Sequence, residues 1–287
     1  MCASINVQEQ EHGPKTWDWQ EATRIEKPAP LITVTTPTIR LHGAQMVLNT
    51  LQSQTFKRWD WLISTKEDLV DEFYYEFGDQ AEVFAEPYNP IHKVQIYKSN
   101  NYLASIARGE LIVTIVDWTY LSPDALQKLW DYYKLNPLTM IGLTGKFYKE
   151  VKIPSVAGEF PSFIGEPAWT NECHPYDAEF GIYHEIDPSK FDFAVASCSK
   201  KAYFVVGGLD EEFDTNGGFA EKEFAARLKK IGFKIYTDHS IEMKGYDHGQ
   251  PAWYKPEHFA RAQEYYRNCL YQIEKGTRVV LPYMLKY

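Results

Sequence analysis

The sequence is poor in cysteine and in long apolar runs. Its 287 residues include four widely separated cysteines and no C-x-x-C pair: Cys2, Cys173, Cys198 and Cys269. This scarcity disfavours a zinc site and indicates a reducing compartment. No segment approaches the roughly 18 consecutive apolar residues of a membrane-spanning helix, and the first 20 residues lack the apolar core of a secretory signal. We therefore expect a cytoplasmic protein, in the host cytoplasm if it is viral.

Positive charge is also scarce. The chain has 30 Lys and Arg against 39 Asp and Glu, a formal net charge of −9. The field of the whole molecule therefore does not attract nucleic acid or anionic lipid. The pairs Lys200 with Lys201 and Lys229 with Lys230 could form a local basic patch, although a solvated face explains them as well. Aromatic residues, in contrast, make up 15% of the chain, and they stack on sugars and bases as well as filling cores.

Strand-like and helix-like segments alternate along the first half of the chain. The predicted strands are residues 31–36, 59–64 and 111–116, and the predicted helices are residues 44–51, 103–108 and a segment that starts at Ser122 and Pro123. Since strand–helix–strand units form parallel crossovers by default, the pattern predicts an α/β fold with an open, mostly parallel sheet and flanking helices.

The second half of the chain begins with a break in this rhythm. Residues 150–192 contain five prolines and little periodicity, which predicts a loop-rich insertion. Order returns at residues 193–199 and 203–208, then in a helix at 221–231, a strand at 233–236 and a helical tail at 256–272. We expect an N-terminal arm (1–29), a main domain (30–250) and a C-terminal helical extension (251–287).

Asp117 is the first candidate functional residue. It directly follows the apolar run 111–116, which is typical of a strand buried on both faces. In open α/β sheets, ligands bind beyond the carboxyl ends of the strands, and a carboxylate there can bind a divalent cation that bridges a diphosphate. An acidic residue in an ordinary turn is the competing interpretation, and position alone leaves the two about equal.

Glu221 is the second candidate. It lies in the first turn of its predicted helix after a glycine-rich segment, where the helix dipole favours an anion. It shares a helix face with Phe224 and Leu228, so it should point toward the sheet and could act as a general base. Glu223 is rotated by about 200° and should face elsewhere. A helix-start acid without any chemistry is the competing interpretation.

His248 is the third candidate. It lies in the segment KGYDHGQ (residues 244–250), after the last predicted strand. A neutral histidine there could bind a metal ion through a ring nitrogen. An exposed loop histidine without function is the competing interpretation.

Together these segments resemble the family 2 glycosyltransferases of the GT-A fold. The resemblance runs from about Leu31 to His248 and rests on five pieces in the right order. They are PLITVTTPT (30–38), LNTLQSQT with WDWLI (48–63), Asn101 with ARGELI (107–112), GGLDEEF (207–213), and the helix at residues 221–228. The last two are similar to the family's GGFDExF and EDxDLxxRL motifs.

The resemblance implies an inverting transferase that moves a sugar from a nucleotide-diphosphate donor, usually a UDP-sugar, with Mn²⁺ or Mg²⁺ on the diphosphate. By position, Glu221 would be the catalytic base, and Asp117 and His248 would bind the metal. The implied donor-binding residues are Thr36, Pro37, Thr38, Thr65, Asn101, Arg108, Asp117 and Trp118. The implied acceptor-side residues are Trp169, Gly218 and Glu223. The metal would neutralise the leaving diphosphate while the carboxylate activates the acceptor.

Three departures from the family pattern bear on these expectations. The DxD acid cluster is reduced to Asp117-Trp118-Thr119, which predicts weaker intrinsic metal binding. Thr65 and the residues after it replace the acidic pair that normally follows the second strand, so the donor base is open. Glu221 stands where the family has Asp, and its extra methylene shifts the carboxylate by about 1.5 Å.

Three functions fit this sequence. The first is a glycosyltransferase that acts on a glycan or glycolipid. The second is a phage-type enzyme that glycosylates a hydroxymethylated DNA base, against which the acidic charge argues. The third is a GT-A module that binds nucleotide or sugar without turnover, for which the reduced DxD motif argues.

Overall fold

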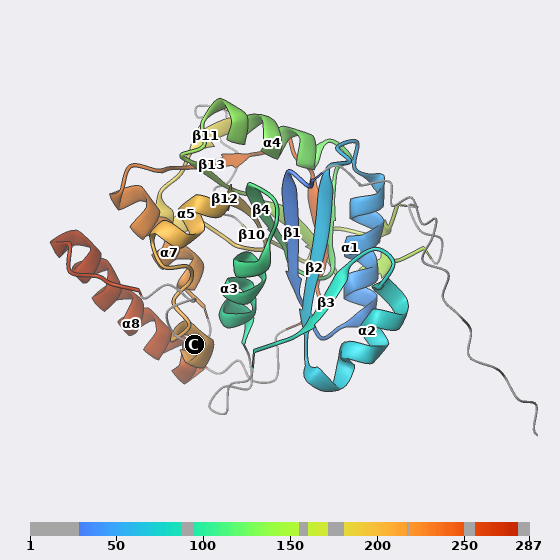
Figure 1. The fold of residues 1–287 in the computed structure, drawn as a ribbon, viewed down its shortest axis with the longest axis horizontal. Helices are drawn as coiled ribbons and strands as arrows, with labels where there is room; N and C mark the ends of the chain where they lie inside the picture. The colour runs from blue at the N-terminus through green and yellow to red at the C-terminus, as the bar shows by residue number, and fades with distance from the viewer. Residues whose placement is uncertain are drawn as a thin grey trace, which may run out of the picture.

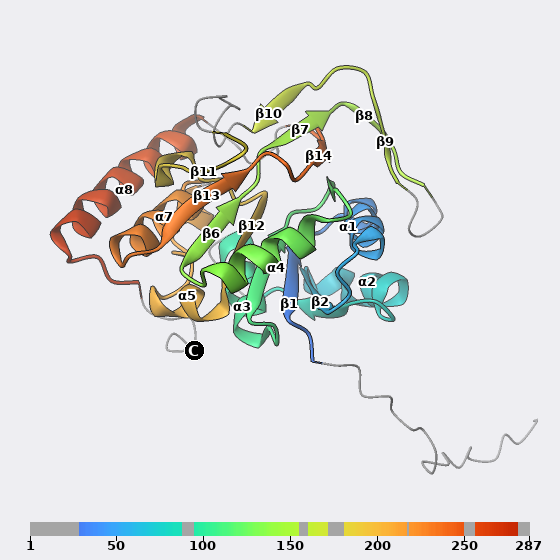
Figure 2. The same ribbon diagram turned by 90° about the horizontal axis from the view of Figure 1, so that it is seen from above.

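The computed structural model describes residues 29–87, 95–154, 160–171, 181–216, 218–249 and 256–280. Most of the predicted N-terminal arm (1–29) lies outside these residues. Figures 1 and 2 show a central sheet with helices on both faces and a smaller sheet beside it. Among the described helices, none combines the length and the apolar composition that crossing a bilayer requires.

The central sheet has eight strands in the order β11-β13-β6-β12-β4-β1-β2-β3. Their bounds are β1 Ile32–Pro37, β2 Trp59–Thr65, β3 Glu82–Ala85, β4 Leu111–Ile115, β6 Thr139–Gly142, β11 Tyr183–Glu185, β12 Val195–Ser199 and β13 Lys234–Asp238. Strands β1 to β4 are parallel, β12 runs antiparallel between β4 and β6, and β11 is an antiparallel edge strand. The predicted mostly parallel α/β sheet is confirmed.

Helices cover both faces of this sheet. Their bounds are α1 Leu41–Ser53, α2 Val70–Phe77, α3 Ile96–Ile106, α4 Ala125–Leu135, α5 Lys200–Val205, α6 Phe213–Asn216, α7 Ala220–Lys230 and α8 Pro256–Lys275, with short 3₁₀ turns η1 Glu67–Leu69 and η2 Pro188–Lys190. Side chains alternate across the strands, so Trp61 and Ile63 pack with α1, α2 and α4, whereas Leu62 packs on the other face with α3 and α7. Helix α8 lies along the outer side of α7 (Figure 1).

A four-stranded sheet in the order β10-β7-β14-β5 stands beside the central sheet. Its strands are β5 Thr119–Leu121, β7 Gly145–Tyr148, β10 Trp169–Asn171 and β14 Met243–Tyr246, and a separate hairpin joins β8 Glu150–Lys152 to β9 Ser162–Ile164. The predicted insertion at 150–192 therefore contains β8 to β11 as well as loops. Strands of three residues are too short to show a period of two in the sequence.

Several predicted boundaries need correction. Helix α4 begins at Ala125 with Asp124 at its N-cap, not at Ser122 and Pro123. Helix α3 begins at Ile96, seven residues before the predicted start, and part of the predicted segment 203–208 belongs to helix α5. The helix at 221–231 and the strand at 233–236 each agree to within two residues with α7 and β13.

Candidate active site

Asp117 lies at the carboxyl edge of the central sheet, two residues after β4 ends. Its side chain is 7% exposed and its carboxylate binds the guanidinium of Arg40, with Nε 2.7 Å from Oδ2 and Nη2 2.9 Å from Oδ1. The hydroxyl of Thr38 donates a 2.5 Å hydrogen bond to Oδ2. Both carboxylate oxygens are therefore occupied by donors from the segment that leads from β1 into α1.

The backbone after Asp117 is strained. Trp118 has a φ of 61°, a left-handed conformation that costs an L-residue about 1–2 kcal/mol. Its ring packs at 4.8 Å on the ring of Tyr246 in β14. Gly43 makes the close approach of α1 possible, because a Cβ there would lie 2.9 Å from the Cβ of Asp117 and 3.1 Å from the indole nitrogen of Trp118.

The predicted donor residues of β1 and β2 gather at this same edge. Thr36 is fully buried and accepts a 3.0 Å hydrogen bond from the indole of Trp61, so its hydroxyl supports the sheet. Pro37 ends β1, and Thr38 is held between Asp117 and the backbone N–H of Arg40. Thr65 ends β2 and is 1% exposed.

His248 follows β14 and lies near Asp117. The N–H of Tyr246 bonds the carbonyl of Trp118 at 3.0 Å, which brings the residues after β14 beside those after β4. Partial burial and then the positive charge of Arg40 lower the pKa of His248, while Asp117 and Asp247 oppose the shift. The ring is therefore neutral at pH 7.

Glu221 lies in the first turn of α7 and is half-buried. The hydroxyl of Tyr97, at the start of α3, donates a 3.2 Å hydrogen bond to its Oε2. Burial raises the pKa of Glu221, and the negative charge of Asp192 raises it further. A carboxylate whose pKa moves toward neutrality is a better proton acceptor at that pH, which suits a general base.

The sheet register links Asp117 to Glu221. Strand β12 begins where β4 ends, and the N–H of Val116 donates to the carbonyl of Ala194 at 2.9 Å. Asp192 lies two residues earlier, and its charge acts on Glu221. The residue whose charge acts on Glu221 therefore lies just before β12, the strand that pairs with the end of β4.

Asp214 fixes the start of α3, which carries Tyr97. Its two carboxylate oxygens accept hydrogen bonds from the backbone N–H groups of Tyr97 at 2.9 Å and Lys98 at 3.0 Å. Burial raises the pKa of Asp214 to about 7, against the lowering effect of those two bonds. The position of the Tyr97 hydroxyl, and through it that of Glu221, depends on this cap.

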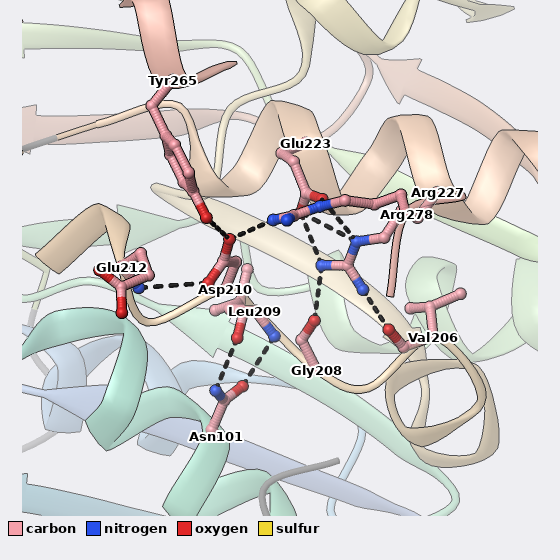
Figure 3. A network of polar contacts seen from close by, with 10 residues as sticks. All are labelled: Asn101, Val206, Gly208, Leu209, Asp210, Glu212, Glu223, Arg227, Tyr265 and Arg278. Atoms are coloured by element: carbon pink, nitrogen blue, oxygen red, sulfur yellow. Dashed lines mark hydrogen bonds and ion pairs between the residues drawn. The ribbon is translucent and has the colours of Figure 1, made fainter. Parts of the chain in front are cut away.

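A buried ion-pair network lies behind the glycine-rich segment (Figure 3). Glu223 is 0% exposed and accepts hydrogen bonds from the guanidinium groups of Arg227 and Arg278. Arg278, which follows α8, also pairs with Asp210, and the hydroxyl of Tyr265 donates to Asp210 at 2.8 Å. Glu223 lies on the face of α7 that α8 covers, and not on the face that packs on the sheet. With no exposed surface, Glu223 cannot contact an acceptor.

Asn101 also has a structural position rather than an open one. It is 1% exposed, and its amide exchanges two 2.8 Å hydrogen bonds with the backbone of Leu209 and donates to Glu211 at 2.9 Å. Gly208, at a φ of 76°, permits this approach, since a Cβ there would lie 2.6 Å from the Asn101 oxygen. In this structure Asn101 anchors the glycine-rich segment, and its contact with the donor stays a prediction.

Arg108 lies at the opposite edge of the sheet from Asp117. Its backbone N–H bonds the hydroxyl of Thr33 near the start of β1, and its side chain pairs with Asp60 at 2.7 Å and Glu82 at 2.5 Å, at the starts of β2 and β3. Ligands of such sheets bind at the carboxyl edge, so this position does not support the donor contact of Arg108, which stays a prediction.

The predicted acceptor-side residues Trp169 and Gly218 are accessible. Trp169 is 45% exposed. Its indole ring stacks on the ring of Phe147, with the ring centroids 4.0 Å apart and an angle of 2° between the ring planes. A ring held in this way offers a flat apolar surface. Gly218, at a φ of 103°, precedes α7 with open space where a Cβ would stand.

The residues around Asp117 do not fit the divalent cation that the resemblance implies. A metal site needs free carboxylate oxygens, and those of Asp117 bind Arg40 and Thr38. The guanidinium also places a positive charge where the cation would sit. In the described part of the chain, no three His, Cys, Asp or Glu side chains are grouped closely enough to hold a metal ion.

Sequence reasoning missed four residues of this region: Arg40, Tyr97, Asp214 and Arg278. Each acts on a partner between 55 and 124 positions away, apart from the local contact of Arg40 with Thr38. Only Arg40 carried a local signal, since a cation two residues after the predicted P-T turn lies close to the donor edge.

Neither a protein-family model nor a curated protein matches this chain. Among solved structures, the chain is similar to TarS from S. aureus. The complex of TarS 1–349 with UDP has 11% sequence identity and a TM-score of 0.56, over 83% of this chain and 64% of that one. The complex with UDP-GlcNAc has 10% sequence identity and a TM-score of 0.58, over 83% of this chain and 66% of that one. A longer TarS structure has 12% identity and a TM-score of 0.55, over 82% of this chain and 38% of that one.

The chain thus spans about two thirds of the length of the TarS 1–349 structures. At this level of identity the likeness shows the fold. It supports the GT-A-like glycosyltransferase fold expected from the sequence, with a mostly parallel central sheet and flanking helices.

Proposed function

We propose that this protein is a glycosyltransferase that moves a sugar from a nucleotide-diphosphate donor, with UDP-sugar the first candidate. The observation that supports the proposal is the position of Asp117 at the carboxyl edge of the central sheet, where the segment before β12 carries Asp192, whose charge raises the pKa of Glu221. The fold likeness to TarS structures that hold UDP or UDP-GlcNAc supports it. Membership of family 2 remains part of this proposal.

The proposed reaction inverts the anomeric carbon in one displacement. The acceptor hydroxyl gives its proton to the carboxylate of Glu221, and its oxygen forms a bond to the anomeric carbon. The bond from that carbon to the donor phosphate oxygen breaks, and its electron pair leaves with the nucleoside diphosphate. The raised pKa of Glu221 and its hydrogen bond from Tyr97 support this assignment, since they match the proton affinity and the position of the base to the task.

The donor is proposed to lie over Thr38, Asp117 and Trp118, where β1 and β4 end. Thr65 at the end of β2 would border the nucleoside. The acceptor is proposed to approach from the side of Gly218 and Trp169, and the exposed ring of Trp169 suits a sugar of a glycan or glycolipid.

A Glu221→Gln variant tests the base. We expect transfer to fall roughly 10²–10⁴-fold, the usual contribution of a general base, while UDP affinity stays at the wild-type value. Glu257→Gln is the matched control, because Glu257 is an exposed carboxylate on α8. The assay measures UDP release from UDP-GlcNAc and other UDP-sugars with a panel of glycan and lipid-linked acceptors.

Two results would change the conclusion. Wild-type turnover in the Glu221→Gln variant would remove Glu221 from the reaction. Tight UDP binding by the wild type without turnover on any acceptor, including DNA with hydroxymethylated bases, would favour a binding module. The latter has one structural observation in its favour, which is the engagement of Asp117 by Arg40.

A further inference from the structure

Arg40 binds Asp117, the residue that the resemblance to the GT-A family assigns to the metal ion. Its guanidinium meets Asp117 through two parallel N–H···O contacts of 2.7 and 2.9 Å, the strongest geometry available to this pair. Asp117 is 7% exposed, so the pair stands in a partly desolvated setting where its geometry is well defined. The backbone N–H of Arg40 is also fixed, by the hydroxyl of Thr38 at 3.0 Å.

The orientation of Arg40 leaves donors for a ligand. A guanidinium has five N–H groups. In Arg40, the N–H of Nε and one N–H of Nη2 donate to Asp117. The other three make no hydrogen bond to any described residue. The side chain is 40% exposed, so these donors can reach a molecule at the edge of the sheet. Asp117 fixes the guanidinium from behind and leaves its outer side open.

The two described aspartates near this point, Asp117 and Asp247, are each paired with a cation. The positive charge of Arg40 reaches His248, whose pKa it helps to lower, so a neutral imidazole with one N–H donor stands nearby. Lys149 is 80% exposed and pairs with Asp247, the neighbour of His248, at 3.8 Å. Asp117, the carboxylate closest to the site, is already neutralised by Arg40.

We propose that Arg40 binds the diphosphate of the donor directly and takes over the charge-neutralising role of a metal ion. This inference rests on the proposed function. In the displacement described above, negative charge develops on the phosphate oxygen that leaves the anomeric carbon. The free N–H groups of Arg40 donate to the phosphate oxygens and stabilise that charge without a metal ion. Asp117 acts as a positioning residue for Arg40, so its carboxylate does not contact the donor.

The test compares metal dependence with the effect of losing Arg40. Calorimetry measures the binding of UDP and of uridine to the full chain in EDTA and in Mn²⁺. We expect UDP affinity in the wild type to change less than about threefold between the two conditions, whereas Arg40→Ala weakens UDP binding roughly 10- to 150-fold, the effect of losing a charged hydrogen bond. Uridine, which has no phosphate, should bind the wild type and Arg40→Ala alike.

Two further variants make the test specific. Arg40→Lys keeps the charge without the planar fork and should fall between the wild type and Arg40→Ala. Arg58→Ala is the matched control, because Arg58 is exposed and its side chain bonds only the carbonyl of Ala29 among the described residues. The wild-type comparison of EDTA with Mn²⁺ needs no variant, so it stands even where Arg40→Ala loses its fold.

The outcomes separate this inference from the function it rests on. A tenfold or greater gain in UDP affinity with Mn²⁺, or wild-type UDP binding by a folded Arg40→Ala, overturns the role of Arg40 and leaves the glycosyltransferase proposal standing. If none of UDP, GDP, CDP, ADP or dTDP binds the wild type in either condition, both proposals fail together.

Discussion

The network around Glu223 makes the sharpest prediction about stability. Glu223 is fully buried and receives N–H donors from two guanidinium groups, those of Arg227 at 2.7 to 2.9 Å and Arg278 at 2.9 Å. Arg227 also donates to the carbonyls of Val206 and Gly208 (Figure 3). A Glu223→Ala substitution removes the carboxylate and leaves two buried cations with only Asp210 between them.

The expected loss follows from this geometry. Removing one member of a buried ion pair typically costs 3–5 kcal/mol, since the remaining charge is desolvated without a partner. For a chain of 287 residues, 1 kcal/mol corresponds to about 2 °C in Tm, so Tm should fall by roughly 6–10 °C. Urea unfolding and thermal melting at pH 7 both measure this change.

The matched control is Lys134→Ala. Lys134 pairs with Asp131 at 3.0 Å, but both side chains are more than half exposed, so the change should cost less than about 1 kcal/mol. A cycle with Arg278→Ala should also show coupling of about 0.5–3 kcal/mol with Glu223→Ala. If Glu223→Ala is no less stable than Lys134→Ala, or the cycle shows no coupling, the network does not hold α7 in place.

Three further predictions concern the residues around the proposed base. Tyr97→Phe removes the hydrogen bond that lowers the pKa of Glu221, so the acid limb of the kcat/KM profile should move to higher pH; a uniform loss of rate without this shift would contradict the contact. Asp214 has a folded-state pKa of about 7, above its unfolded value, so its contribution to stability is complete below about pH 4 and is lost as pH rises through 7. Asp214→Asn should therefore reduce the decrease in unfolding free energy between about pH 5 and 8. Urea titrations that show an unchanged pH dependence would refute the assignment. A Gly→Ala change normally stabilises a helix by about 1 kcal/mol, but the Cβ of Gly43→Ala would lie too close to Asp117 and Trp118. We therefore expect a lower Tm and, by calorimetry, weaker UDP binding. An increase in both Tm and UDP affinity would show that the structure relaxes to accept the Cβ.

Local sequence signals were enough to predict the elements that carry Asp117 and Glu221. The strand before Asp117 is a continuous apolar run because β4 is buried on both faces, and such a run ends visibly at the first acid. The helix with Glu221 was found from its apolar spacing and from the glycine that follows it. The sequence alone predicted the bounds of β4 and α7 to within one residue.

The burial of Glu223 could not be predicted in the same way. Helical spacing places residues on faces, but it does not show whether a second element covers the outer face. Helix α7 packs on the sheet with Phe224 and Leu228, and on α8 with its other side, so both faces are buried. The charges on the second face, Glu223 and Arg227, satisfy each other and Arg278.

Arg40 shows a second limit of local patterns. The DxD motif appeared reduced because the acids expected beside Asp117 are a tryptophan and a threonine. The residue that we propose to compensate for them precedes Asp117 by 77 positions and is a cation. The motif is made of acidic residues close to Asp117 in the sequence, whereas Arg40 is basic and far from it, so the motif gives no indication of Arg40.

The two halves of the site therefore depend on different parts of the fold. Arg40 and Asp117 are fixed by β1, α1 and β4, which form the first parallel unit of the sheet. Glu221 is fixed by Tyr97 on α3 and by the helix α7, and Arg278, which follows α8, holds α7 through Glu223. Strand β12, antiparallel and paired with β4, connects the halves through Val116 and Ala194, and α3 also packs on β1. A disturbance at the C-terminal end should therefore reach the base before it reaches the diphosphate, which is why the rate and the UDP affinity must be measured separately for every variant.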